Sequence, residues 1–436
     1  MNVNKIQLGI FGGIVLVVIV GALIFTCTIP GLKSCKETTQ KIEAELEFWS
    51  IGDDQRAYEP FLDNFQSLYP GVEVNHRSFA SEEAYATTLL QSLAAGQGPD
   101  VFMISNRSLP KNIAKLAPLP STRMNLIQLR ELFPQVVEQD FAPEGRIYAL
   151  PASIDTLALL YNRDLIDQAG ISVPETWEEF QSVIPRLTEL EDGRRIIQAG
   201  AAIGTSNRNI EQATDILNLL MLQSGTIMVD DEYGEAKFAS SEGVDALRFY
   251  AQFSNARNEV YTWNSGMPNA LDSFARGNTA MIFEYAGSIP EIRERNSFLN
   301  IGIAPAPQPE SAKVDVSYPH YWGFAVSRQS RNAALAWELI LSITTNPETV
   351  SGYLNATNRP PALRSLITGE YANDPDLHVF ARQALTARSW AQADPDEIQD
   401  IFSNVIDLVN TNQQTPARAL QEAEETVTNL MRNSVY

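Results

Sequence analysis

Apolar and polar positions follow two different patterns along this 436-residue chain. Leu8–Phe25 is a continuous apolar run without a charged residue, whereas apolar and polar positions are mixed throughout the later sequence. Because a membrane core requires about 20 apolar residues in helical form, this run predicts one N-terminal transmembrane helix. We expect residues 1–30 to anchor the chain, residues 31–43 to form a linker, and the remainder to be a body held at a membrane face.

The apolar run is longer than the core of a cleavable secretion signal, which has about 7 to 15 residues. The sequence therefore favours an uncleaved signal anchor. The alternative is a lipoprotein signal with a lipid on Cys27 or Cys35. A small residue, Ser34, precedes Cys35, but Thr26 before Cys27 does not fit that pattern. Lysines lie on both sides of the run, so the positive-inside rule alone leaves the orientation open.

The body opens with alternating strand and helix patterns. The expected elements are a strand at 46–50, a helix at 56–69, a strand at 72–74, a helix at 81–94 and a strand at 100–104. This β-α-β-α-β order predicts an α/β fold with parallel strands and helices on the sheet faces. Ligands on such sheets bind beyond the carboxyl ends of the strands. The loops after the first and third strands are therefore candidate binding loops.

Composition excludes several functional classes. The formal charge is −21, with 32 basic and 53 acidic residues and no basic cluster, so the chain is not expected to bind nucleic acid. Both cysteines lie in the anchor and its flank, so the body can form neither a disulfide framework nor a thiolate metal site. The three histidines are scattered, and no nucleotide-loop or hydrolase motif is present. We expect no metal, no cofactor and a monomeric body.

Several segments, taken in order, resemble a known family. They are the opening EFWS, AAGQGPDVF, YALPASIDTLALLYNRDLIDQAG, FARGNTAMIFEYAG, YWGFAVSRQSRNAALAWELI and NRPPALRS. Their order and spacing are similar to those of the extracellular solute-binding proteins of ABC importers, in the maltose-binding-protein-like, sugar-binding class. The resemblance covers essentially the whole body.

The resemblance implies a type II periplasmic-binding-protein-like clamp, in which two discontinuous lobes close on a solute. Lobe one is expected at 44–152 plus 303–328, and lobe two at 153–302 plus 329–436. The lobes should be joined by crossings near 150–153, 301–304 and 327–331. The implied partners are a small solute, most simply a carbohydrate, and the permease subunits of an ABC transporter. The body would then lie on the extracytoplasmic side of the cell membrane.

A sugar presents hydroxyl groups, which carboxylates, amides and arginine bind, and an apolar ring face, which stacks on aromatic rings. The expected cleft loops supply both kinds of side chain. The candidate ligand-binding residues are Trp49, Asp53, Ser105, Asn106, Asp155, Trp263, Glu284, Tyr285, Tyr321, Trp322 and Arg359. Trp263 is the preferred stacking residue. Tyr321 and Trp322 are adjacent, so only one of them should face the solute directly.

Two alternatives to a sugar receptor remain. The same fold can receive a polyamine, a peptide or a glycerol-phosphate compound, but an anionic solute needs basic residues, and Arg359 is the one such candidate. A glycan-acting enzyme would need two carboxyl groups about 5 to 10 Å apart, for which Asp53, Asp155 and Glu284 are available. The resemblance implies no catalysis, so we expect a binding protein and not an enzyme. His320 is interpreted as incidental to the site.

Overall fold

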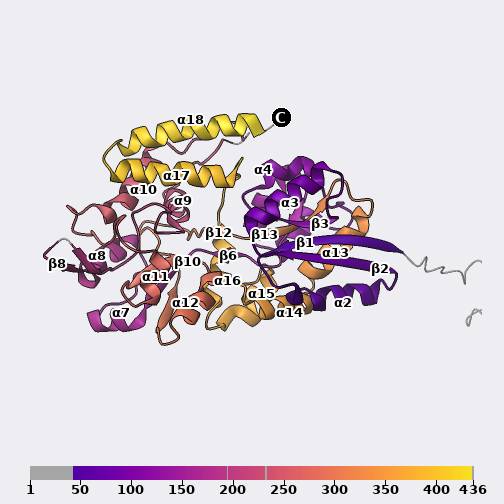
Figure 1. Cartoon of the computed structure of the whole chain (residues 1–436), viewed down its shortest axis with the longest axis horizontal. Helices are drawn as coiled ribbons and strands as arrows, with labels where there is room; N and C mark the ends of the chain where they lie inside the picture. The colour runs from indigo at the N-terminus through magenta and orange to yellow at the C-terminus, as the bar shows by residue number, and fades with distance from the viewer. Residues whose placement is uncertain (1–42, 194, 231–232, 435–436) are drawn as a thin grey trace, which may run out of the picture.

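The computed structural model describes residues 43–193, 195–230 and 233–434. The expected transmembrane helix, most of the linker and both cysteines lie outside these residues. Among the residues described, no helix combines the length and the apolar character needed to cross a bilayer. The described chain folds into two α/β lobes, and β6 (Asp155–Thr156) and β12 (Pro319–His320) lie between them (Figure 1).

Lobe one is built on a mixed sheet with the strand order β2-β1-β3-β13-β4, and β5 also pairs with β13. The strands are β1 (Ala44–Ile51), β2 (Val72–Phe79), β3 (Val101–Ser105), β4 (Leu116–Ala117), β5 (Ala149–Leu150) and β13 (Trp322–Ser327). β1 is parallel to β2 and β3, as the sequence predicted, whereas β13 runs antiparallel to β3. The carboxyl ends of β1 and β3 therefore lie at one edge of the sheet.

The helices of lobe one pack by apolar faces. On α2, the residues Phe61, Leu62 and Phe65 are buried, which confirms the predicted amphipathic helix. The helices are α2 (Glu59–Leu68), α3 (Glu82–Ala94), α4 (Leu109–Asn112), α5 (Leu126–Leu132), α6 (Gln135–Phe141), α13 (Ala333–Thr345), α14 (Pro347–Thr357) and α15 (Arg364–Thr368). Short 3-10 helices are η2 (Gln55–Ala57), η3 (Ile113–Lys115), η4 (Pro143–Gly145) and η7 (Glu370–Asn373).

The position of α13 and α14 differs from the expected division of the chain. α13 packs against β13, β5 and α2, and α14 packs against α2 and α13, so both belong to lobe one although residues 329–436 were expected in lobe two. The reason is that α13 is apolar on most of its surface and must be covered. The chain therefore does not cross at 327–331. It returns later, through α16 (His378–Gln383), η8 (Ala384–Thr386) and the segment 387–394.

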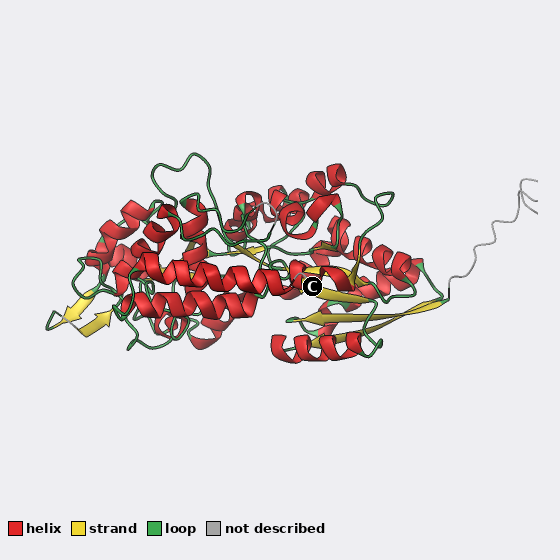
Figure 2. Cartoon of the chain, turned by 90° about the horizontal axis from the view of Figure 1, so that it is seen from above, coloured by secondary structure: helices red, strands yellow, loops and turns green. Residues whose placement is uncertain are grey.

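Lobe two is built on a smaller antiparallel sheet with the order β10-β7-β11. Its strands are β7 (Ala158–Asn162), β10 (Met281–Glu284) and β11 (Ile301–Ala304), with a separate hairpin of β8 (Glu189–Glu191) and β9 (Arg195–Gln198). Its helices are α7 (Arg163–Ala169), α8 (Trp177–Leu187), α9 (Ala213–Gln223), α10 (Ser241–Ala251), η5 (Gln252–Ser254), α11 (Ala270–Ala275), η6 (Ala286–Ser288), α12 (Ile289–Arg295), α17 (Pro395–Asn410) and α18 (Pro416–Ser434). The last two run side by side along the outside of the lobe (Figure 2).

The start of α8 shows how the sequence determines local structure. The Thr176 hydroxyl accepts a hydrogen bond from the Glu179 amide at 3.1 Å, and the Glu179 carboxylate accepts one from the Thr176 amide at 3.4 Å. These two hydrogen bonds form a capping box, for which Thr176 and Glu179 have the required types and spacing. Trp177, the first helical residue, is 4 % exposed and packs on Phe180 and Phe283.

Candidate functional site

A cavity of ≈ 260 Å³ lies between the lobes. Its walls come from the loop after β1, the start of α3, the two crossing strands β6 and β12, and the segment after β10. The lining residues are Ile51, Gly52, Asp53, Ala80, Glu82, Met103, Ser153, Asp155, Tyr285, Gly287, His320, Tyr321, Trp322, Tyr353 and Arg359. Both lobes and the connections between them therefore contribute to one site, at the strand ends where the topology predicted it.

Asp53 and Arg359 form an ion pair on the lobe-one side of the cavity. The guanidinium of Arg359 reaches the Asp53 carboxylate at 2.8 and 2.9 Å, and the Asp53 side chain is only 8 % exposed. The hydroxyl groups of Tyr353 and Tyr58 also donate to Asp53, at 2.6 and 3.3 Å. Burial would lower the pKa of Arg359, but Tyr353 and the charge of Asp53 outweigh burial and raise the pKa. The pair is thus charged, oriented and electrically balanced.

Asp155 is a buried carboxylate held by backbone amides. Its Oδ1 accepts from the amides of Thr156 and Ala286 at 2.9 and 3.1 Å, and its Oδ2 accepts from Gly287 at 3.2 Å. Burial raises the pKa of Asp155 to about 6, although these amides favour the charged form. At neutral pH Asp155 is therefore an ionised, oriented acceptor on the cavity wall.

A second ion pair joins the lobes beside the cavity. Arg107, after β3 in lobe one, donates to both carboxylate oxygens of Asp215 on α9 of lobe two, at 2.9 and 2.8 Å. The cavity-lining Tyr285 donates to the same carboxylate at 2.7 Å. Both charged side chains are largely buried, at 12 % and 8 % exposed. Burial would raise the pKa of Asp215, but the Arg107 charge outweighs burial and lowers it.

His320 lies between the two ion pairs. It is directly opposite Asp155 in the β12–β6 pair, and its ring meets that of Tyr285 edge-on at 5.6 Å. Burial, and next the charge of Arg107, lower the pKa of His320 to about 4, so the ring is neutral at physiological pH. His320 lines the cavity, which the sequence did not predict. Its signal in the sequence was its place immediately before Tyr321 and Trp322.

The adjacent aromatic residues Tyr321 and Trp322 both line the cavity but make different contacts. Tyr321 is 3 % exposed, and its hydroxyl donates to the buried carboxylate of Asp140 at 2.7 Å. Trp322 is half-buried, and Tyr85 supports its ring edge-on at 6.1 Å. The indole of Trp322 and the ring of Tyr285 are aromatic surfaces that line the cavity and can stack on a solute.

Six of the predicted ligand-binding residues line the cavity and five do not. Those that line it are Asp53, Asp155, Tyr285, Tyr321, Trp322 and Arg359. Those that do not are Trp49, Ser105, Asn106, Trp263 and Glu284. The sequence also missed Glu82, Ser153 and Tyr353, which reach the cavity. Glu82 follows β2, so the rule that ligands bind beyond strand ends could have found it, whereas Tyr353 comes from a helix with no such signal.

Each of the five excluded residues has a structural reason. Trp263 is 0 % exposed inside lobe two, which contradicts its predicted stacking role. Trp49 is 7 % exposed and packs against Phe79, with the Arg77 guanidinium 5.2 Å from its ring.

Ser105 and Asn106 support the loop after β3 without reaching the cavity. The Asn106 side chain is buried, donating to Asp140 at 3.2 Å and accepting from the Tyr321 amide at 3.2 Å. The Ser105 hydroxyl accepts from the Arg107 amide at 3.4 Å. Both residues therefore position the segment that carries Arg107.

Glu284 is buried beneath the cavity wall. It accepts from the hydroxyl of Ser288 at 2.8 Å and from the side chain of Gln212 at 3.2 Å. Burial raises the pKa of Glu284 to about 7. Glu284 does not line the cavity and Asp53 is paired with Arg359, so these two residues do not supply the free facing carboxyl pair that a glycosidase needs.

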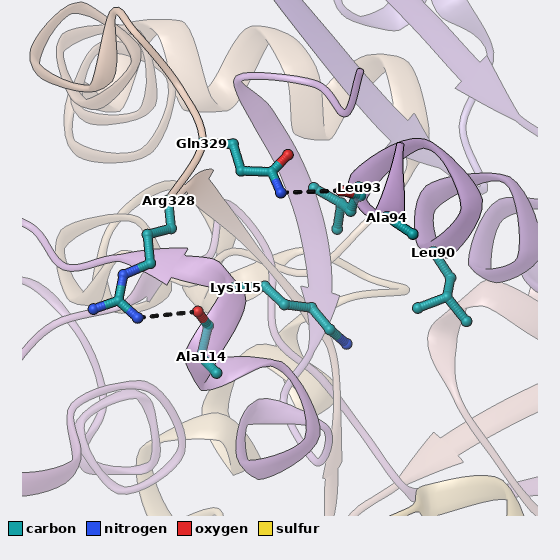
Figure 3. Close-up of a pocket in the computed structure, with 7 residues that line it drawn as sticks. All are labelled: Leu90, Leu93, Ala94, Ala114, Lys115, Arg328 and Gln329. Carbon is teal, nitrogen blue, oxygen red and sulfur yellow. Dashed lines mark hydrogen bonds between the residues drawn. The ribbon is translucent and has the colours of Figure 1, made fainter. Parts of the chain in front are cut away.

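A depression of ≈ 350 Å³ lies on lobe one, away from the crossings (Figure 3). It is bordered by Leu90, Leu93, Ala94, Ala114, Lys115, Arg328 and Gln329. The side chains of Arg328 and Gln329 donate to backbone carbonyls of Ala114 and Leu93, at 3.3 and 3.0 Å. It lies where β3 begins and β13 ends, which is the sheet edge opposite the interlobe cavity. Within the described residues, no group of histidine, cysteine and acidic side chains is arranged to hold a metal.

The fold and the site together define a two-lobed solute-binding protein, and comparisons with known proteins agree. Residues 49–348 match the family model described as bacterial extracellular solute-binding protein. The chain therefore belongs to this family, as the resemblance predicted.

The relatives are distant and cover most of the chain. The chain is 20 % identical over 346 residues to a maltotriose-binding protein of Pyrococcus abyssi, covering 76 % of this chain and 69 % of that protein. It is 24 % identical over 360 residues to a galactooligosaccharide-binding protein of Bacillus subtilis, covering 76 % and 77 %. The cyclic alpha-maltosyl-1,6-maltose binding protein from Arthrobacter globiformis has the same fold, with a TM-score of 0.76 and 19 % identity over 90 % of this chain and 100 % of that one.

Proposed function

We propose that this protein is the receptor of an ABC importer, and that it captures a carbohydrate between its lobes and delivers it to the permease. The observation that carries the proposal is the interlobe cavity, which combines oriented hydroxyl-binding groups with an open indole face. Asp155 and the Asp53–Arg359 pair supply the polar contacts, and Trp322 supplies the stacking surface. Sugar-binding relatives support the same class of solute.

The charges at the cavity favour a neutral solute over an anionic one. Arg359 is the one basic residue that lines the cavity within the described chain, and it is already paired with Asp53. A phosphate or carboxylate group would also face the charge of Asp155. The receptor interpretation is preferred over an enzyme, because the Asp53 carboxylate is paired with Arg359 and both oxygens of Asp155 accept backbone amide hydrogen bonds.

The N-terminal apolar run supports the location of this function. Leu8–Phe25 is long enough to span with its flanks, so we propose a single span with the body on the extracytoplasmic side. Membranes from cells that produce the full chain should retain it after an alkaline wash, whereas a chain that begins at residue 43 should be released. Release of the full chain by the same wash would refute the anchor.

Thermal unfolding of the purified full chain against a solute panel tests the receptor proposal. The panel contains maltotriose, galactooligosaccharides, mannitol, a polyamine, short peptides and glycerol phosphate. A ligand at 100 times its Kd stabilises the folded state by about 2.7 kcal/mol. We expect stabilisation by a neutral saccharide, its loss in Asp155→Asn, and its retention in Asp245→Asn, an exposed position on α10. Stabilisation by amines or anions alone would refute the carbohydrate.

A further inference from the structure

We infer that His320 is a solute-binding, specificity-determining residue, and that it restricts the cavity to uncharged polyhydroxylated solutes. This inference rests on the proposed function and names the solute class more closely. It begins from the unused hydrogen-bonding atoms on the cavity wall. Neither ring nitrogen of His320 has a hydrogen-bond partner in the described chain, although His320 lines the cavity.

The position of the ring is determined by its neighbours. His320 pairs with Asp155 across the β12–β6 ribbon, and side chains directly opposite each other in such a pair point to the same face. Both residues accordingly line the cavity. Tyr285 covers one side of the imidazole at 5.6 Å, so the ring is held in place by packing and not by hydrogen bonds of its own.

Charged groups surround His320 and oppose its protonation. Arg107 and Arg359 both disfavour a positive ring, whereas Asp215 favours one. Each of these arginines is itself paired, Arg107 with Asp215 and Arg359 with Asp53. Together with burial, this environment keeps the imidazole neutral, and a neutral imidazole offers one donor and one acceptor. A sugar hydroxyl offers the same combination.

The acidic side chains at the cavity offer a cation less than their formal charge. Burial raises the pKa of Glu82, which weakens its charged form. Both oxygens of Asp155 already accept backbone amide hydrogen bonds, from Thr156, Ala286 and Gly287. These amides compensate much of the carboxylate charge, as hydrogen bonding to an ionised group does. A cationic solute would also be repelled by the nearby guanidinium groups. An anionic solute would find no unpaired basic group, so an uncharged solute with adjacent hydroxyls fits best.

Two substitutions separate hydrogen bonding from packing. His320→Phe keeps a ring against Tyr285 but removes both hydrogen-bonding atoms, whereas His320→Gln keeps a donor and an acceptor but removes the ring. For the saccharide that stabilises the wild-type chain, we expect affinity to fall about tenfold or more in His320→Phe and less in His320→Gln. A packing role would give the reverse order, which would overturn the inference. His378→Gln is the matched control and should bind as the wild type does.

Histidine NMR provides a readout that a structural role would not move. The chain contains three histidines, so the ring signals of His76, His320 and His378 can be distinguished by substitution. Addition of the stabilising saccharide should shift the His320 signal and leave the other two in place. Binding without a change at His320 would overturn the inference while leaving the proposed function intact.

A charge series tests the solute class. The stabilising saccharide is compared with its amino-sugar analogue and its phosphate ester by titration calorimetry. We expect the uncharged parent to bind at least about tenfold more tightly than either derivative, a difference of about 1.4 kcal/mol. Tighter binding of a charged derivative would overturn the inference. If no saccharide of the panel stabilises the wild-type chain, the proposed function fails and this inference fails with it.

Discussion

Replacing Asp215 with asparagine removes one charge from the ion pair that joins the two lobes. The wild-type carboxylate receives two hydrogen bonds from Arg107 and one from Tyr285, at 2.9, 2.8 and 2.7 Å. Asparagine has nearly the same size but one acceptor oxygen, and its NH₂ group would face the N–H groups of Arg107. The variant therefore leaves a buried guanidinium without a compensating charge.

The magnitude follows from the burial of the pair. With the side chains only 12 % and 8 % exposed, removing one partner is expected to cost about 3–5 kcal/mol. The hydrogen bonds to a charged group, at about 1.5–3 kcal/mol each, would sum to more, but they share one network and are not additive. The Nε of Arg107 already lacks a partner within the described residues, and the other contacts of the guanidinium, to the Tyr285 hydroxyl and the Pro319 carbonyl at 3.4 and 3.5 Å, carry no compensating charge.

Because the Arg107–Asp215 pair joins the two lobes, Asp215→Asn could also respond by separation of the lobes. Separation of the lobes would return Arg107 to water without unfolding either lobe. If separation costs less than 3–5 kcal/mol, the variant will open before it unfolds. We therefore expect Asp215→Asn either to lower the free energy of unfolding by this amount or to increase the radius of gyration in solution.

Urea denaturation and small-angle X-ray scattering measure the two outcomes. The control is Asp245→Asn, which removes one member of a pair that is 64 % and 70 % exposed and should cost less than about 1 kcal/mol. Arg107→Met combined with Asp215→Leu should recover most of the loss, because apolar pairs of similar volume often replace buried ion pairs without penalty. A loss below about 1 kcal/mol with an unchanged radius would refute the reasoning.

Three further predictions concern the cavity and its surroundings. Because the pKa of Asp155 is raised to about 6, this carboxylate becomes protonated in the solute-free protein as the pH falls. The affinity for the solute, measured by calorimetry, should therefore drop about tenfold per pH unit below 6. An affinity that is unchanged from pH 7 to 5 would exclude Asp155 as the hydroxyl acceptor. Trp263→Ala should lower the free energy of unfolding by about 3–5 kcal/mol, because Trp263 is fully buried, whereas Trp322→Ala should chiefly weaken solute binding. Denaturation and calorimetry on both variants measure the two effects, and a larger loss of binding in Trp263→Ala than in Trp322→Ala would contradict the prediction. Tyr353→Phe removes the 2.6 Å hydrogen bond to Asp53 and should lower the free energy of unfolding by about 1.5–3 kcal/mol; an unchanged urea midpoint would contradict this.

The pH prediction for Asp155 has opposite signs for binding and for stability. Its pKa is raised in the folded state, from 3.8 to about 6, so its contribution to stability is present below the unfolded value and is lost as pH rises through 6. Solute binding requires the ionised carboxylate and therefore improves over the same interval. An empty protein that becomes more stable on acidification while its affinity decreases would show both effects of the one group.

The opening of lobe one could be predicted because its elements are determined locally. The helix expected at 81–94 is observed at Glu82–Ala94, where the Ser81 hydroxyl accepts a hydrogen bond from the Ala84 amide at 3.3 Å. The strand expected at 46–50 lies within β1, whose alternating apolar side chains are buried. Capping and periodicity act within a few residues, so one sequence is enough to read them.

The tertiary placement of later elements could not be predicted in the same way. The run 156–161 (TLALLY) has the apolar pattern of a single strand, but the structure divides it into β6 and β7, which pair with different partners. β6 and β12 have two residues each, too few to show a period. The assignment of α13 to the wrong lobe has the same origin, since an apolar helix shows that it is buried but not against which sheet.

The site residues that were predicted correctly are those whose position along the backbone determines where the side chain points. Asp53 was found because it follows a predicted strand, and Asp155 because it follows the expected crossing near 150–153. Trp263 was wrong because a loop rich in glycine, proline and asparagine was expected to be open, yet the indole turns into lobe two and is fully buried. Loop composition indicates where the backbone bends, but packing decides which way a large side chain points.

Tyr285 connects the interlobe cavity with the ion pair that joins the two lobes. Its ring lines the cavity and packs on His320, while its hydroxyl donates to Asp215, the lobe-two partner of Arg107. A solute that packs against this ring therefore touches the residue that helps to orient the interlobe ion pair. Separation of the lobes would expose Arg107 and Asp215 to water and would also open the cavity. Solute contact with the Tyr285 ring and the Arg107–Asp215 ion pair would therefore both favour the closed arrangement of the lobes. The crossing strands thus place recognition and closure in one connected set of side chains.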